Sequence, residues 1–191
     1  CRNISSEHGN ALDITLSTSC FIPKPFTPFQ WEPMDDIESL MEKQYHLKNL
    51  IKKRTRKIKY NYHDAKLSFL EAVLARGDRR LGKVIYAAWE KGCKFDGWDE
   101  FFSFDKWMKA FEECEVSPEF YANRSRDYNE VLPWDHINIG VTKKFLIREN
   151  EKAHVGDLTG NCKTICSNCG VQSYKTGICT TTRRRLSYDD V

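Results

Sequence analysis

The segment Leu12–Ile22, LDITLSTSCFI, alternates between two kinds of side chain. One face carries apolar side chains and a cysteine, while the other carries small polar side chains: Asp13, Thr15, Ser17 and Ser19. An alternation of period two over this length, rich in Thr and Ile, predicts a β-strand. The strand must end at Pro23-Lys24-Pro25, because proline has no N–H to donate to a ladder.

A single strand leaves its backbone groups unpaired, so this one needs partner strands. The rest of the sequence offers only two short candidates, His136–Val141 and Val171–Tyr174. We therefore expect most of the sheet to lie upstream of Cys1. The chain is then the C-terminal part of a larger protein and carries no complete catalytic site. A helix follows the strand directly, which is how parallel βα units are built.

The remainder is predicted to be mainly helical, because apolar residues recur at helical spacing behind capping residues. The predicted helices begin near Asp35, Asp64, Asp78, Ser103, Ser117 and Thr142. The first of them ends in the basic run Lys52–Lys57, where cations favour the helix dipole. The expected fold class is α+β, mainly α with a minor β component.

The composition is that of a globular protein with no membrane helix. Of the 191 residues, 40% are apolar and 13% aromatic, and the net charge of +3 neither demands nor excludes a polyanionic partner. No apolar run is long enough to span a bilayer, and no secretory signal is recognisable. Four of the eight cysteines are scattered and the other four lie in the tail, a distribution that favours a reducing cytoplasm over a disulfide scaffold.

The tail contains a cysteine cluster with the spacing C-x3-C-x2-C. Cys162, Cys166 and Cys169 form it, and Cys179 follows. Thiolates this close together select zinc or an iron–sulfur cluster. The fourth ligand is either Cys179 or a histidine from elsewhere. Free cysteines in a mobile tail, or disulfides formed during handling, are the alternative.

Five blocks spread over most of the chain carry a resemblance to a known family. They are ITLSTSCFIPKPFTPFQW (14–31), EAVLARGDRR (71–80), FDGW (95–98), PWDHINIGV (133–141) and CKTICSNCGV (162–171). Their order resembles the C-terminal part of one uncharacterised family of radical S-adenosylmethionine (radical SAM) proteins with a B12-binding domain. The early catalytic cysteine motif and the cobalamin domain of that family are absent from this sequence. Only 22 residues follow Cys169, so the tail cluster cannot be the catalytic cluster of a barrel encoded downstream.

The resemblance implies that the alternating strand is a late barrel strand. Asp13, Thr15, Ser17 and Ser19 would then face the lumen, and Lys24 and Thr27 would lie at its C-terminal mouth, all toward substrate or cofactor. The competing interpretation is an edge strand whose polar face meets water. The implied domains are a terminal βα unit of the barrel (1–58), a helical domain (59–155) and a cysteine-rich metal-binding tail (156–191).

The resemblance implies that the chain is one part of an enzyme and that it has no activity by itself. The upstream domains of the same protein would bind S-adenosylmethionine and cobalamin. The chain itself would close the barrel, and its tail would hold an auxiliary iron–sulfur cluster or a structural zinc. An alternative is a helical module with a zinc site that binds RNA through its basic segments, Lys52–Lys59 and Arg183–Arg185. The third interpretation is that the chain is a purely structural cap, in which the tail metal serves only stability.

Overall fold

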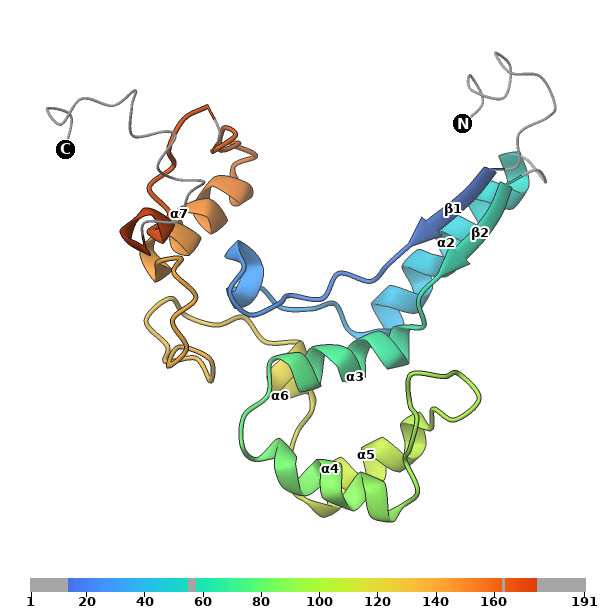
Figure 1. The fold of residues 1–191 in the computed structure, drawn as a ribbon. Helices are drawn as coiled ribbons and strands as arrows, with labels where there is room; N and C mark the ends of the chain where they lie inside the picture. The colour runs from blue at the N-terminus through green and yellow to red at the C-terminus, as the bar shows by residue number, and fades with distance from the viewer. Residues whose placement is uncertain (1–13, 55–57, 163, 175–191) are drawn as a thin grey trace, which may run out of the picture. The chain divides into compact units, whose positions relative to one another are not determined.

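The computed structural model describes residues 14–54, 58–162 and 164–174 (Figure 1). Helices take up 46% and strands 6% of it, which confirms the mainly helical class. The chain divides into two compact units. Unit 1 contains the described residues up to Ile22 together with Pro33–Arg124, and unit 2 contains Pro23–Glu32 together with the described residues from Ser125 onward.

Unit 1 begins with a parallel β–α–β arrangement. Strand β1 (Ile14–Thr18) pairs in parallel with β2 (Ile58–Tyr62), with Ile14 opposite Ile58 and Thr18 opposite Tyr62. A parallel pair needs a long crossover connection, and helix α2 (Ile37–Arg54) lies within it. Figure 1 shows α2 running along one face of the two strands.

Strand β2 is absent from the sequence-based prediction, which continues the preceding helix to Lys57 and finds few partners for β1. The segment IKYNY alternates like a strand, with Ile58 and Tyr60 half-buried and Lys59 and Asn61 exposed. The two predicted partner strands are wrong. Residues 136–141 form turns and bends, and Val171–Tyr174 is a single 3-10 turn, η3.

The helices of unit 1 agree closely with the prediction. They are α3 (Ala65–Ala75), α4 (Leu81–Glu90), α5 (Phe104–Glu113) and the single turn α6 (Glu119–Ala122). Helix α3 contacts α2 and α6, and α4 contacts α5. Their apolar faces form one core, with Val73, Val84 and Phe111 among the residues almost fully removed from solvent.

Capping side chains fix where several helices start. Asp64 accepts a hydrogen bond from the N–H of Leu67 at 2.9 Å and is the N-cap of α3. The predicted cap of α2 is wrong by one residue. Asp36, not Asp35, accepts from the N–H of Ser39 at 2.7 Å, while Asp35 forms an ion pair with Lys43.

Unit 2 is built from the 3-10 turn η2 (Pro28–Trp31), helix α7 (Lys143–His154) and η3. Thr142 caps α7 as predicted, accepting from the N–H of Phe145 at 3.2 Å. A small core gathers around four buried side chains, Trp31, Leu132, Trp134 and Leu146.

These units differ from the three domains expected from sequence, with boundaries after residues 58 and 155. A boundary after 58 would divide β2, which pairs with β1 along its whole length. The segment Pro23–Glu32 lies between β1 and α2 in the sequence but belongs to the same unit as α7, because η2 packs against that helix. No helix of the described ranges is both long and apolar enough to cross a bilayer.

Candidate functional site

The carboxyl ends of β1 and β2 lie side by side, because the strands are parallel and in register. The ladder continues one step beyond them, where the N–H of His63 donates to the carbonyl of Thr18 at 3.2 Å. Ligand sites of parallel sheets lie outside the carboxyl ends of the strands. This end of the sheet is therefore the first place to look for a site.

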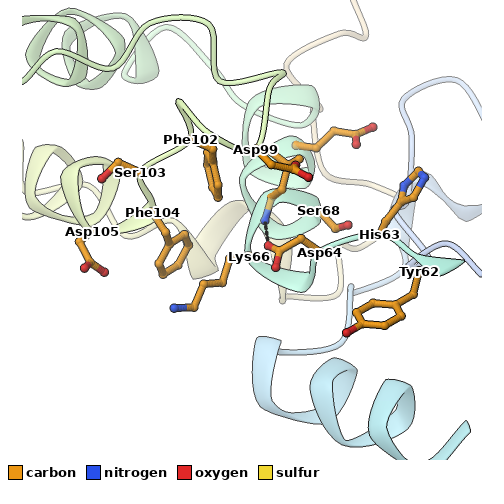
Figure 2. A pocket seen from close by; sticks show the side chains of 12 residues that line it. Tyr62, His63, Asp64, Lys66, Ser68, Asp99, Phe102, Ser103, Phe104 and Asp105 are labelled. Atoms are coloured by element: carbon orange, nitrogen blue, oxygen red, sulfur yellow. Dashed lines mark hydrogen bonds between the residues drawn. The ribbon is translucent and has the colours of Figure 1, made fainter. Parts of the chain in front are cut away.

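A pocket opens next to the carboxyl end of β2, with a cavity volume of about 810 Å³. Three pieces of unit 1 line it: the end of β2 with the two residues after it, one side of α3, and the segment that leads into α5 with the first two residues of that helix (Figure 2). The lining residues are Tyr62, His63, Asp64, Lys66, Leu67, Ser68, Glu71, Asp99, Phe102, Ser103, Phe104 and Asp105.

Three residues of this pocket have well-defined positions. Lys66 places its Nζ atom 5.2 Å from the centroid of the Phe104 ring, which Figure 2 shows beside it. Phe104 is fixed from behind by an edge contact with the buried ring of Phe69, with 6.3 Å between centroids. Ser68, on α3, is only 3% exposed and also lines the pocket.

Side chains beneath the strand ends hold the backbone of His63 in place. The amide of Gln44, on α2, donates to the carbonyl of His63 at 2.8 Å and lies 3.5 Å from Cys20 Sγ. The thiol of Cys20 lies 3.9 Å from the same carbonyl. This small cluster connects β1, α2 and the start of α3, so the pocket wall is anchored on regular elements.

The predicted lumen residues that the structure describes, Thr15, Ser17 and Ser19, do not line the pocket. Thr15 and Ser17 are exposed on the face of β1 that α2 does not cover, and Ser19 is exposed just beyond the strand. Asp13 lies outside the described residues. The predicted lumen positions on β1 therefore point to a different surface from the pocket.

Lys24 and Thr27 belong to unit 2, whereas β1 belongs to unit 1. Thr27 donates its hydroxyl to the carbonyl of Lys24 at 2.8 Å, which ties the two residues into one local turn. The predicted mouth residues therefore have a structural role that the resemblance does not indicate.

The cysteine tail is described in part. Cys162 is exposed, Cys166 and Cys169 are half-buried, and all three are free thiols. Within the described ranges, no three His, Cys, Asp or Glu side chains lie close enough to hold a metal ion. Cys179 lies outside those ranges. Closely spaced thiols are typical ligands of zinc and of iron–sulfur clusters. The metal site at the tail therefore stays a prediction that rests on the chemistry of these side chains.

The loop that carries Cys166 and Cys169 is fastened to helix α7. The carbonyl of Cys169 accepts from the N–H of Thr142 at 2.9 Å, and Arg148 donates to the carbonyl of Ser167. Gly170 has φ +105°, and a Cβ atom there would lie 2.6 Å from Thr142 Cγ2. Only glycine fits this close approach in that conformation.

A separate charged cluster stabilises the corner between α3 and α4. The guanidinium of Arg80 donates to both carboxylate oxygens of Asp78 in three hydrogen bonds, and the hydroxyl of Tyr121 donates to Asp78 at 3.0 Å. Mainly because of Arg80, the pKa of Asp78 is lowered to about 2. Burial and the neighbouring carboxylate raise the pKa of Tyr121. All three side chains have partners within the protein, so we assign this cluster to structure.

No protein-family model, curated protein or solved structure matches this chain. The site therefore has to be interpreted from its own geometry. The sequence-based prediction does not include the pocket residues, because their first segment, Tyr62-His63-Asp64, begins at the last residue of β2, a strand that the prediction also lacks. The available signal was the doublet His63-Asp64 at the junction of an alternating segment and a helix start.

Proposed function

We propose that this chain is the C-terminal portion of a radical S-adenosylmethionine enzyme, where it completes a parallel sheet and adds a metal site. The observation that supports this most directly is the in-register parallel pairing of β1 and β2 around α2. Repeated β–α–β steps of this kind build a βα barrel. The family resemblance of the five sequence blocks supplies the identity of the enzyme class.

The exposed face of the strand pair also supports a larger sheet. All-parallel sheets are normally covered on both faces, and two strands alone are rarely stable in water. Here α2 lies along one face, while Thr15 and Ser17 of β1 and Lys59 and Asn61 of β2 are exposed on the other. In our proposal further strands extend the sheet beyond β1, and this polar face lines the lumen.

The upstream domains of the same polypeptide would bind S-adenosylmethionine and cobalamin. When bound, these groups supply the radical chemistry, and this chain contributes the wall of the barrel. Cys162, Cys166, Cys169 and Cys179 would hold an auxiliary iron–sulfur cluster or a zinc ion. The free thiols at Cys20, Cys93 and Cys114 support the expected cytoplasmic location, where thiols stay reduced.

An assay of reductive S-adenosylmethionine cleavage tests the proposal. The 191-residue chain alone, reconstituted with iron and sulfide under a strong reductant, should release no 5′-deoxyadenosine. The polypeptide that also carries the upstream sequence should release it. Cleavage by the chain alone, or no cleavage by the longer polypeptide, would contradict the proposal.

Hydrogen exchange tests the extension of the sheet separately. In the chain alone, the β1 amides that do not donate to β2 should exchange rapidly, because no strand covers that edge. In the longer polypeptide the same amides should be protected strongly. Equal exchange in both proteins would mean that no strand is added beside β1.

One observation favours a second candidate function, binding of single-stranded RNA. The rings of Tyr60 and Tyr62 are tilted by 33° with 5.4 Å between their centroids, and Lys48 Nζ lies 5.8 Å from the Tyr62 ring. The last turn of α2 adds three exposed cations, Lys52, Lys53 and Arg54. Aromatic rings beside cations are typical of single-strand binding, which weakens steeply with salt. Absence of binding to a short oligoribonucleotide at low salt would remove this candidate.

A further inference from the structure

We propose that the pocket beside the carboxyl end of β2 binds an organic cation, a ligand with an ammonium or similar group on an apolar body. The proposal goes beyond the function proposed above, because it depends only on unit 1 and on no metal, cluster or upstream domain.

The formal charge of the lining selects the sign of the ligand. Four carboxylates line the pocket, Asp64, Glu71, Asp99 and Asp105, against the single ammonium of Lys66. With histidine counted as neutral, the lining carries three net negative charges. Carboxylates that surround one cavity raise the local concentration of cations and repel anions.

The start of α3 is not available to an anion. Helix N-termini bind anions through backbone N–H groups that lack helical partners. Here the N–H of Leu67 donates to the carboxylate of Asp64 and the N–H of Ser68 donates to its carbonyl, at 2.9 and 3.0 Å. Asp64 also places its own negative charge where a phosphate or carboxylate ligand would have to sit.

Aromatic rings supply the second element of cation recognition. Phe102, Phe104 and Tyr62 line the cavity together with the acidic side chains. Phe104 already faces one cation, because Lys66 Nζ lies 5.2 Å from its ring centroid. Rings beside carboxylates suit a cation that has apolar substituents, whereas a small hydrated metal ion gains little from the rings.

Ser68 adds a hydroxyl group to the lining. Its side chain is only 3% exposed and lines the cavity, and a hydroxyl can both donate to and accept from a polar ligand. The cavity volume of about 810 Å³ lies within the range of small-molecule sites.

Titration with three benzyl compounds of similar shape tests the proposal. Benzylammonium, benzyl alcohol and benzoate are each added to the uniformly 15N-labelled chain, and amide shifts are followed by NMR. Benzylammonium should shift the amides of Tyr62–Ser68 and Asp99–Asp105 in a saturable manner. Benzyl alcohol should bind at least about threefold more weakly, and benzoate should not shift these amides.

Matched variants assign the effect to the pocket. Asp99→Asn and Asp105→Asn should each weaken benzylammonium binding by about two- to tenfold, the effect of removing one partly exposed charge. Glu112→Gln changes an exposed carboxylate near the other end of α5, outside the pocket, and should leave the affinity unchanged. Ser68→Ala should weaken binding without altering the preference for the cation over benzoate.

Three outcomes would overturn the proposal: no saturable shifts at the pocket, benzoate binding as well as benzylammonium, or an equal loss of affinity in Glu112→Gln and Asp105→Asn. Because the titration needs no metal and no reductant, its result is independent of the S-adenosylmethionine assay.

Discussion

The hydroxyl of Tyr60 lies 2.8 Å from the hydroxyl of Thr18 and joins β2 to β1 across the parallel pair. The two residues are 42 positions apart in the sequence, so this contact forms only if the strands pair in the observed register. It provides a direct chemical test of the β–α–β arrangement.

A double-mutant cycle measures this contact. Tyr60→Phe and Thr18→Val should each lower the free energy of unfolding by about 0.5–1.5 kcal/mol, the usual net value of one hydrogen bond. The double variant should lose less than the sum, because the shared bond is removed only once. Urea unfolding of the chain gives all four values. Strict additivity would mean that the two hydroxyls do not meet.

Asp78 makes unit 1 sensitive to acid. Its folded pKa of about 2 lies below the ordinary value of 3.8, so the charged carboxylate stabilises the folded state above pH 3.8. This stabilisation is lost as the pH falls from about 4 to about 2. Asp78→Asn should therefore be less stable than the parent at neutral pH, by about 1 kcal/mol once solvent screening is allowed for. The difference should disappear near pH 2.

The partner of this carboxylate gives the control. Arg80→Gln should remove most of the same acid dependence, because Arg80 is the main cause of the lowered pKa. The urea unfolding midpoints of the parent and both variants, measured between pH 2 and neutral pH, test this prediction. A stability difference between parent and Asp78→Asn that does not change with pH would show that the ion pair is not responsible.

Asn150 is a buried polar side chain in the core of unit 2. It is 1% exposed, accepts a hydrogen bond from the hydroxyl of Tyr128 and donates to Glu32 at 2.8 Å. Asn150→Ala should destabilise unit 2 by about 2–3 kcal/mol, since it leaves polar partners unsatisfied. Faster amide exchange throughout α7 is the expected signal. Asn129→Ala, at an exposed position, is the control and should leave α7 exchange unchanged.

Gly170 should be intolerant of any side chain. Its φ of +105° strains other residues, and an added Cβ would clash with Thr142 at the start of α7. Gly170→Ala should therefore detach the Cys166–Gly170 loop from α7 and increase the reactivity of the half-buried Cys169 toward a thiol reagent. Gly160→Ala, where an added Cβ meets nothing within 4 Å, is the matched control. Equal Cys169 reactivity in parent and Gly170→Ala would contradict this prediction.

Interactions between residues close in the sequence, such as helix caps, could be predicted far better than the pairing of strands that are distant in the sequence. The predicted cap at Thr142 acts on the N–H of Phe145, three residues away, so a short window contains all the information. Strand β2 depends on a partner more than 40 residues upstream and follows a basic run that suits a helix end. Residues 136–141 show the converse, because Ile137 and Ile139 alternate like a strand but remain half exposed in turns.

The pocket could not be predicted for the same reason. Its lining runs from Tyr62 to Asp105 and is brought together only by the packing of α3 and the segment before α5. The charges of Asp99 and Asp105 are ordinary in sequence, and their significance comes from the aromatic rings and the buried Ser68 beside them. The cysteine cluster is different, because its spacing is visible in the sequence alone and its chemistry follows from the donors.

Metal and acid-labile sulfide analysis of the anaerobically purified chain tests the proposed function most directly, beside Cys166→Ser and the control Cys114→Ser in unit 1. We predict iron with inorganic sulfide in the parent and in Cys114→Ser, and loss of both in Cys166→Ser. Zinc near one equivalent per chain without sulfide, lost in Cys166→Ser, would contradict an auxiliary cluster and favour the RNA-binding candidate. Metal that is retained in Cys166→Ser would contradict a site at the cysteine tail.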